Sequence, residues 1–156
     1  MKGKWFICWL MCVFFLSGCG KRELLEEKLD AEQIDKIVVT MAMGNPADGA
    51  DCKIITDAAE IAEMVELFNQ ATVEGKIASG EEWEAGSGSY AFFHGEEQVL
   101  KLNCNANDAE RIWINDGFYE IAYPQDKRSP YGLYGFSDAE RMKVDGEGRI
   151  IKCPES

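Results

Sequence analysis

Histidine is almost absent from this chain of 156 residues, since His94 is the only one. A zinc site would therefore need cysteine or carboxylate ligands, and no C-x-x-C motif follows residue 18. His94 stands beside Gly95 in a predicted tight turn, and no local serine or cysteine motif accompanies it. We interpret it as an exposed turn residue, with a catalytic base as the alternative. The sequence predicts no metal and no cofactor.

Basic residues are also scarce, with 16 Lys and Arg against 28 Asp and Glu, for a net charge of −12. The first eighteen residues hold Lys2 and Lys4 and no acid, so their removal takes the net charge from −12 to −14. Such a charge repels phosphate backbones, so we expect no nucleic-acid partner. A cationic protein or a cationic envelope component would be attracted by this charge and is therefore a more favourable partner than nucleic acid. A solvated acidic surface without a partner is the alternative.

No apolar run is long enough to cross a bilayer as a helix. The longest, Trp5 to Gly18, has 14 residues and would extend about 21 Å, against a hydrocarbon core about 30 Å thick. A short apolar run after a basic start is typical of a secretory signal peptide.

The run ends in Leu16-Ser17-Gly18-Cys19, which resembles the lipobox of bacterial lipoprotein precursors. The resemblance implies a signal peptide over residues 1–18, cleavage between Gly18 and Cys19, and diacylglycerol on the Cys19 thiol. Two or three acyl chains, at about 0.8 kcal/mol per buried CH2, would anchor the chain stably to a lipid bilayer. The predicted location is the extracytoplasmic face of the cell membrane. An uncleaved anchor and a buried helix are the alternatives.

We divide the rest of the chain into three parts. Residues 19–33 are polar and predict a lipidated tether, in which leucines at helical spacing allow a short helix. Residues 34–123 predict an α+β domain. Residues 124–156 predict a C-terminal segment that packs on the domain or is partly flexible.

Periodicity predicts the elements of the domain. Residues 34–43 and 51–56 are predicted strands that pair as a hairpin. Asp57 and Glu60 then form a predicted capping box. The helix that they begin has one apolar face, made of Ile61, Met64, Val65, Phe68 and Ala71.

Residues 73–88 predict a loop, and four more strands follow it. Residues 89–93 and 98–104 flank a His-Gly-Glu-Glu turn, and residues 111–115 and 118–123 flank Asp116-Gly117. With these two as loop residues, the pairs are Ile112 with Ile121, Ile114 with Tyr119, and Trp113 with Glu120.

The fold class is therefore α+β, with an antiparallel sheet of about six strands in the order ββαββββ and one amphipathic helix on one face. Residues 142–144 and 149–153 allow an extra C-terminal hairpin. The stretch Ile34–Tyr123, with its two strands, helix starting at "ITD" and meandering strands, resembles small extracytoplasmic lipoprotein domains of Gram-positive bacteria. That resemblance implies no catalytic residues.

Three cysteines remain besides Cys19, namely Cys52, Cys104 and Cys153. Export permits a disulfide, and Cys52–Cys104 is the candidate pair. Buried thiols that act as small apolar side chains are the alternative.

A partner surface is predicted from aromatic residues that leave the core face, namely Trp113 and Phe118, with Trp83 in an acidic loop. Coverage of that face by residues 130–153 is the alternative. We therefore predict a lipid-anchored, non-catalytic domain that binds a protein or an envelope component. A cell-envelope hydrolase and a structural or accessory lipoprotein are the other two hypotheses.

Overall fold

The structure is a computed structural model of the whole chain. It describes residues 21–43, 50–78, 86–105, 108–127, 130, 140–144 and 150–152. The predicted signal peptide and the lipidation site Cys19 lie outside these ranges, as do Trp83 and Cys153.

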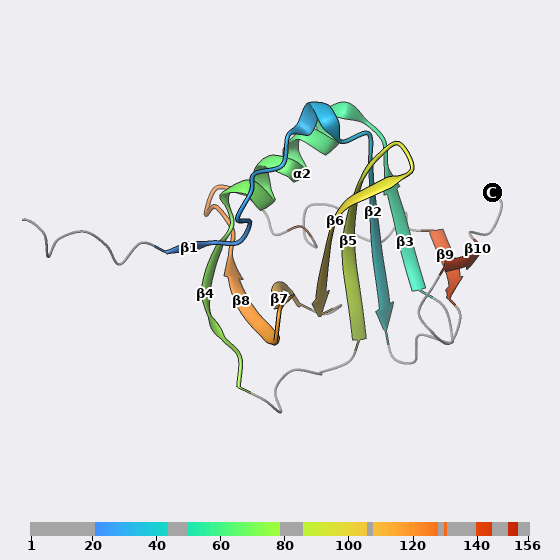
Figure 1. Cartoon of the computed structure of the whole chain (residues 1–156). Helices are drawn as coiled ribbons and strands as arrows, with labels where there is room; N and C mark the ends of the chain where they lie inside the picture. The colour runs from blue at the N-terminus through green and yellow to red at the C-terminus, as the bar shows by residue number, and fades with distance from the viewer. Residues whose placement is uncertain are drawn as a thin grey trace, which may run out of the picture.

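The described residues form one open antiparallel sheet beside a helix, as expected for the α+β class (Figure 1). The strand order is β1-β4-β8-β7-β6-β5-β2-β3-β9-β10. The strands are β1 (Arg22–Glu23), β2 (Lys36–Met43), β3 (Ala50–Ile55), β4 (Thr72–Lys76), β5 (Gly86–His94), β6 (Glu97–Asn105), β7 (Asp108–Ile114), β8 (Gly117–Ala122), β9 (Glu140–Val144) and β10 (Ile150–Lys152).

The count of ten strands in the described sheet corrects the expected six. β1 has only two residues, and β4 occupies part of the predicted loop 73–88. The sequence of β4, TVEGK, is mostly exposed and offers little apolar periodicity. It forms a strand because it pairs with β8, with Thr72 opposite Ala122. The expected C-terminal hairpin is present as β9 and β10.

The helix α2 (Ala58–Gln70) begins where the sequence predicts. The Asp57 side chain accepts hydrogen bonds from the backbone N–H groups of Ala59 and Glu60, each at 3.0 Å. This cap satisfies two of the amides that a helix leaves unpaired at its start. All the residues of the predicted apolar face are buried, together with Leu67.

The core lies between α2 and one face of the sheet. The Phe68 ring contacts the rings of Tyr90 and Phe92 on β5, with centroids 5.1 and 5.6 Å apart. Ile37 on β2 and Ile112 on β7 are fully buried in the same cluster. The helix and the central strands therefore share one continuous core.

The β7–β8 hairpin has a different register from the one predicted. Trp113 pairs with Phe118 and Ile112 pairs with Tyr119, so the two loop residues are Asn115 and Asp116. Asn115 has a φ of 51°, and asparagine adopts this left-handed conformation more readily than most residues. The shift moves the partner strand by two residues, so the same side chains still face the core.

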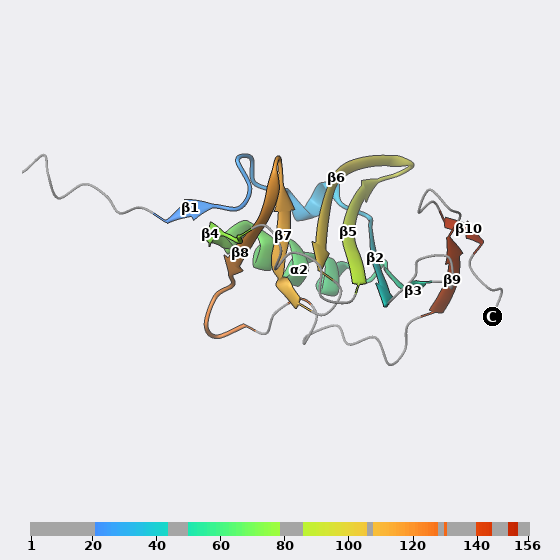
Figure 2. The ribbon, with the colours of Figure 1, turned by 90° about the horizontal axis from the view of Figure 1, so that it is seen from below.

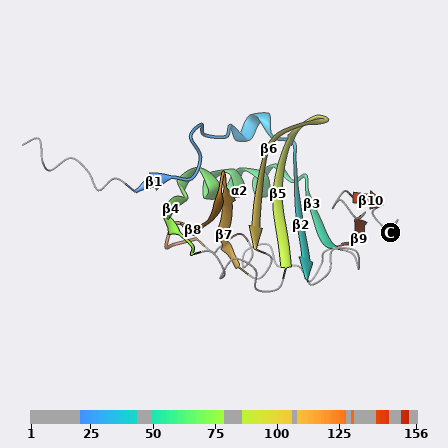
Figure 3. The same cartoon turned by 60° about the horizontal axis from the view of Figure 1, so that its bottom comes forward.

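The two ends of the described chain lie at opposite ends of the sheet (Figure 2). β9 pairs with β3, with Ala50 opposite Met142, so the C-terminal hairpin extends the sheet beyond β3 (Figure 3). At the other end β1 pairs with β4.

Part of the predicted tether packs into the domain. Leu24 and Leu25 are 9% and 6% exposed and belong to the core cluster. Residues 24–30 are irregular, and only the single-turn 3-10 helix η1 (Ala31–Gln33) follows them. The packed chain therefore starts at β1, before the predicted boundary at Ile34.

Candidate functional site

The described residues form a groove of about 750 Å³. Three segments line it: the N-terminal segment from Arg22 to Ile34, the first part of β6, and the end of β7. Its apolar residues are Leu24, Leu25, Leu29, Ile34, Val99, Leu100, Leu102, Trp113 and Ile114. We refer to this site as the β6 groove.

Hydrogen bonds to α2 hold the N-terminal wall of the β6 groove in place. The Leu24 N–H donates to the Ala71 carbonyl at 2.9 Å. The Asn69 side chain accepts from the Leu29 N–H and donates to the Leu29 carbonyl, both at 2.8 Å. The Lys28 ammonium donates to the Asn69 carbonyl. An irregular segment is thus fixed through its own backbone groups, which would otherwise be costly to bury.

The opposite wall is a strand with an unpaired edge. β6 pairs with β5 from Glu97 to Asn105, but with β7 only through Asn103, Cys104 and Asn105. Within the described ranges, residues 97–102 therefore have no strand on the β7 side. Edge strands present alternate N–H and C=O groups outward, and here they face the groove that Val99, Leu100 and Leu102 line.

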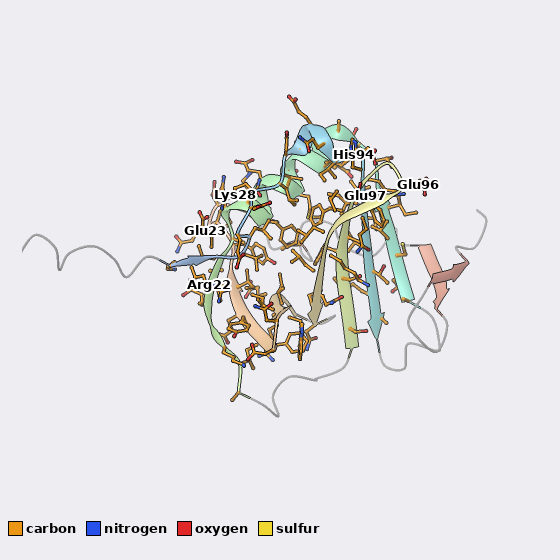
Figure 4. All side chains as sticks on the ribbon, viewed as in Figure 1. Arg22, Glu23, Lys28, His94, Glu96 and Glu97 are labelled. Carbon is orange, nitrogen blue, oxygen red and sulfur yellow. The ribbon has the colours of Figure 1, made fainter. Side chains whose placement is uncertain are left out.

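The charged residues of the groove lie on its rim. Glu26, Glu27 and Lys28 are exposed to solvent. Lys28 forms an ion pair with Glu23 at 3.0 Å, and Figure 4 shows this pair beside Arg22 near β1. Asp30 accepts from the Glu32 N–H at 3.0 Å and from the Gln33 side chain at 3.2 Å.

The aromatic residues predicted as a partner surface have separate positions. Trp113 is 38% exposed at the end of the β6 groove. Phe118 is only 3% exposed and meets the Trp113 ring edge-on, with centroids 5.2 Å apart. Phe118 is therefore a supporting residue and not part of an exposed surface. Trp83 lies outside the described residues.

His94 is exposed at the end of β5, next to the turn that joins β5 to β6. Its Nδ1 donates to the Gln33 carbonyl at 2.7 Å, and the neighbouring Gly95 N–H donates to the Asp35 carboxylate at 2.6 Å. Gly95 has a φ of 59°, which glycine adopts without strain. Figure 4 shows His94 with Glu96 and Glu97 at this hairpin end, where these bonds tie the hairpin to the start of β2.

The possible Cys52–Cys104 disulfide does not fit the structure. Cys52 lies on β3 and Cys104 on β6, and the strands β2 and β5 lie between them. Three strand spacings of about 4.8 Å separate the two backbones, whereas a disulfide requires Cα atoms within about 7 Å. Both residues are 1% exposed, as the alternative interpretation of buried thiols expects.

Among the residues that the structure describes, three titrating groups have shifted pKa values, and all three lie outside the β6 groove. A hydrogen bond from Lys127 lowers the pKa of Glu66, and the same bond raises the pKa of Lys127. A hydrogen bond from Lys76 lowers the pKa of Asp116. These shifts arise from exposed ion pairs, with Nζ to Oε2 or Oδ2 distances of 3.0 and 2.6 Å.

Within the described ranges, no group of three histidine, cysteine, aspartate or glutamate side chains is placed to hold a metal ion. No helix in those ranges is both long and apolar enough to cross a membrane. Searches of protein-family models, curated proteins and solved structures found no match to this chain.

The sequence analysis named Trp113 as part of a partner surface, but it identified no other residue of the β6 groove. Leu24, Leu25 and Leu29 were visible as an apolar pattern in a polar segment, and that pattern was the available signal. The open edge of β6 had no signal in the sequence. It depends on where β7 stops pairing, and that follows from the tertiary structure.

Proposed function

We propose that this chain is a bacterial lipoprotein, tethered through acylated Cys19 to the extracytoplasmic face of the cell membrane. Its domain binds a protein or an envelope component and performs no catalysis. The support for the tether is the basic start, the 14-residue apolar run and the sequence Leu16-Ser17-Gly18-Cys19. Residues 24–30 pack on the domain directly after the predicted lipid site, which would hold the β6 groove near the bilayer.

The β6 groove is the observation that supports a binding function. Nine of its sixteen lining residues are apolar, and its charged side chains are exposed at the rim. Binding sites commonly combine an apolar floor with a polar rim, because the floor supplies affinity and the rim supplies orientation. A hydrolase would instead require a base and an acid that converge on one point.

The tether is tested by mass spectrometry of the protein from its native host. We expect a chain that begins at Cys19 and carries the mass of two or three acyl chains. Cys19→Ser should leave an unlipidated precursor with its first eighteen residues. An intact Met1 end in the wild-type protein, or a mature Cys19 without lipid, would contradict the proposal.

The binding function is tested by photocrosslinking in cells, with a photoreactive phenylalanine at position 99 or 54. Val99 and Ile54 are both exposed strand residues, at 45% and 47%, but only Val99 lines the β6 groove. We expect a discrete adduct from position 99 and none from position 54. Identical adducts from the two positions, or no adduct from either, would count against the β6 groove as a binding site.

A further inference from the structure

The open edge of β6 extends over six residues, from Glu97 to Leu102. At about 3.3 Å per residue, this edge is roughly 20 Å long. An exposed row of N–H and C=O groups is a template for another strand. Beside residues 103–105, the described sheet continues from β6 to β7 and β8. The unpaired edge along residues 97–102 is therefore a notch within the sheet.

We propose that the partner of the β6 groove is an extended polypeptide segment in which basic side chains alternate with apolar ones, and that it adds as a strand to β6. This inference rests on the proposed binding function and specifies the chemistry of the partner. Strand addition gives affinity through main-chain hydrogen bonds, and pockets for alternate side chains give specificity.

The apolar half of the pattern follows from the floor of the groove. The groove is lined by Leu25 and Leu29 on its N-terminal wall and by Leu100 on β6. Leu25 belongs to the core cluster, and the other two leucines pack against it. Side chains of a strand alternate between two faces. Every second residue of an added strand would therefore meet this floor, where apolar side chains are favoured.

The basic half of the pattern follows from the rim. The groove is lined by three carboxylates, Glu26, Glu27 and Asp30, and by Arg22 and Lys28. Lys28 is already paired with Glu23. The rim is therefore net acidic, as is the whole chain at −12. Lysine or arginine in the segment would meet complementary charge, and glutamate would be repelled.

A polypeptide fits this groove better than an acyl chain does. A hydrocarbon chain carries no donors or acceptors, so it would leave the outward amides of β6 covered and unpaired, which is costly. A second copy of this domain would bring the same net negative charge to an acidic rim, which disfavours self-association.

The test uses the purified full chain and an array of seven-residue peptides. In these peptides lysine or arginine alternates with valine, leucine, isoleucine or phenylalanine. We expect saturable binding by members of this array. Replacing the basic residues of a binding peptide by glutamate should weaken it at least tenfold. N-methylation of alternate backbone amides should weaken it as much, because only strand addition uses those amides.

Two matched variants place the peptide in the groove. Val99→Lys puts a cation beside β6 and should weaken peptide binding at least tenfold. Ile54→Lys makes the same kind of change at an equally exposed strand position outside the groove and should leave it unchanged. Glu26→Gln with Glu27→Gln should weaken binding several-fold, whereas Glu63→Gln on the exposed side of α2 should have no effect.

Several results would overturn the inference. They are the absence of binding by every array member, binding that N-methylation leaves intact, or palmitate binding that Val99→Lys blocks while no peptide binds. If these occur while photocrosslinking from position 99 still gives its discrete adduct, strand addition fails and the proposed binding function stands. If position 99 gives no adduct either, both fail.

Discussion

At the scale of single residues, the exposed end of β4 is fixed by Lys76. Its ammonium lies 2.6 Å from an Asp116 oxygen in the β7–β8 turn, and the Tyr119 hydroxyl donates to the other oxygen at 3.2 Å. The two donors stabilise the ionised carboxyl and lower its pKa below the ordinary value of 3.8. Because the pair is exposed, we expect it to affect titration more than stability.

Lys76→Met should raise the pKa of Asp116 toward its ordinary value, as followed by NMR of the carboxyl carbon against pH. The folded pKa is the depressed one, so the stabilisation from this pair is present above pH 3.8 and is lost as the pH falls through the folded value. Lys127→Met should instead raise the pKa of Glu66 and leave that of Asp116 unchanged. An unchanged Asp116 titration in Lys76→Met would contradict the assignment.

Gly88 on β5 is required for close packing. A Cβ at this position would lie 2.2 Å from the Met41 sulfur and 2.8 Å from the Cys104 sulfur, and both of those side chains are buried. Gly88→Ala should lower the free energy of unfolding by about 1–3 kcal/mol, which is typical of an overfilled core. Urea unfolding measures this change.

Gly75 on β4 is the matched control, because a Cβ there meets nothing within 4 Å. Gly75→Ala should be neutral or slightly stabilising, since alanine has fewer conformations to lose on folding. Equal destabilisation by the two substitutions would show that loss of glycine, and not the contact with Met41 and Cys104, is the cause.

At the scale of elements, α2 acts on the site through Asn69. Its side chain bonds to the N–H and the carbonyl of Leu29, both part-buried. This pair of bonds is one of the links that fix an irregular segment as a wall of the β6 groove. One face of α2 thus packs in the core. Asn69, in the last turn of the helix, holds one wall of the β6 groove in place.

Asn69→Ala should lower the free energy of unfolding by about 1–3 kcal/mol, because two backbone groups of Leu29 lose their partners. Hydrogen exchange at the Leu29 amide should become faster. Gln70→Ala removes only an exposed bond to Glu66 and should change stability by less than about 0.5 kcal/mol. Unaltered exchange at Leu29 in Asn69→Ala would show that other contacts hold this wall.

The predicted and observed elements differ where pairing overrides local pattern. α2 was predicted from its cap and its apolar spacing, since a helix forms its hydrogen bonds within itself. The face of the β7–β8 hairpin was predicted, but its register was not, because Asn115 takes the left-handed position in the turn. β4 was missed because only its pairing with β8 makes it a strand.

At the scale of the whole molecule, the N-terminal segment from Arg22 to Ile34 is the part of the predicted tether that packs on the core. Leu24 and Leu25 pack with residues of α2 and of the central strands in one cluster. A force applied to the tether would therefore be transmitted to the N-terminal wall of the β6 groove. This makes the segment a structural part of the domain as well as the link to the proposed lipid.

Leu25→Ala should lower the free energy of unfolding by about 2–5 kcal/mol, as expected for a buried leucine. Val99→Ala, at an exposed position of the same groove, should change it by no more than about 0.5 kcal/mol. Chemical denaturation of the full chain measures the two values. A cost for Leu25→Ala below about 1 kcal/mol would indicate a segment that only rests on the domain.

The sequence by itself determined the α+β class, the place and cap of α2 and the face that packs on it, whereas lipidation at Cys19 stays a prediction. These depend on local patterns, because turn chemistry, helix capping and side-chain periodicity involve residues close together in the chain. Tertiary structure alone decided the joining of β4 to β8, the separation of Cys52 from Cys104, and the notch between β6 and β7. Each depends on backbone hydrogen bonds between distant segments, which contribute no periodic signal of their own.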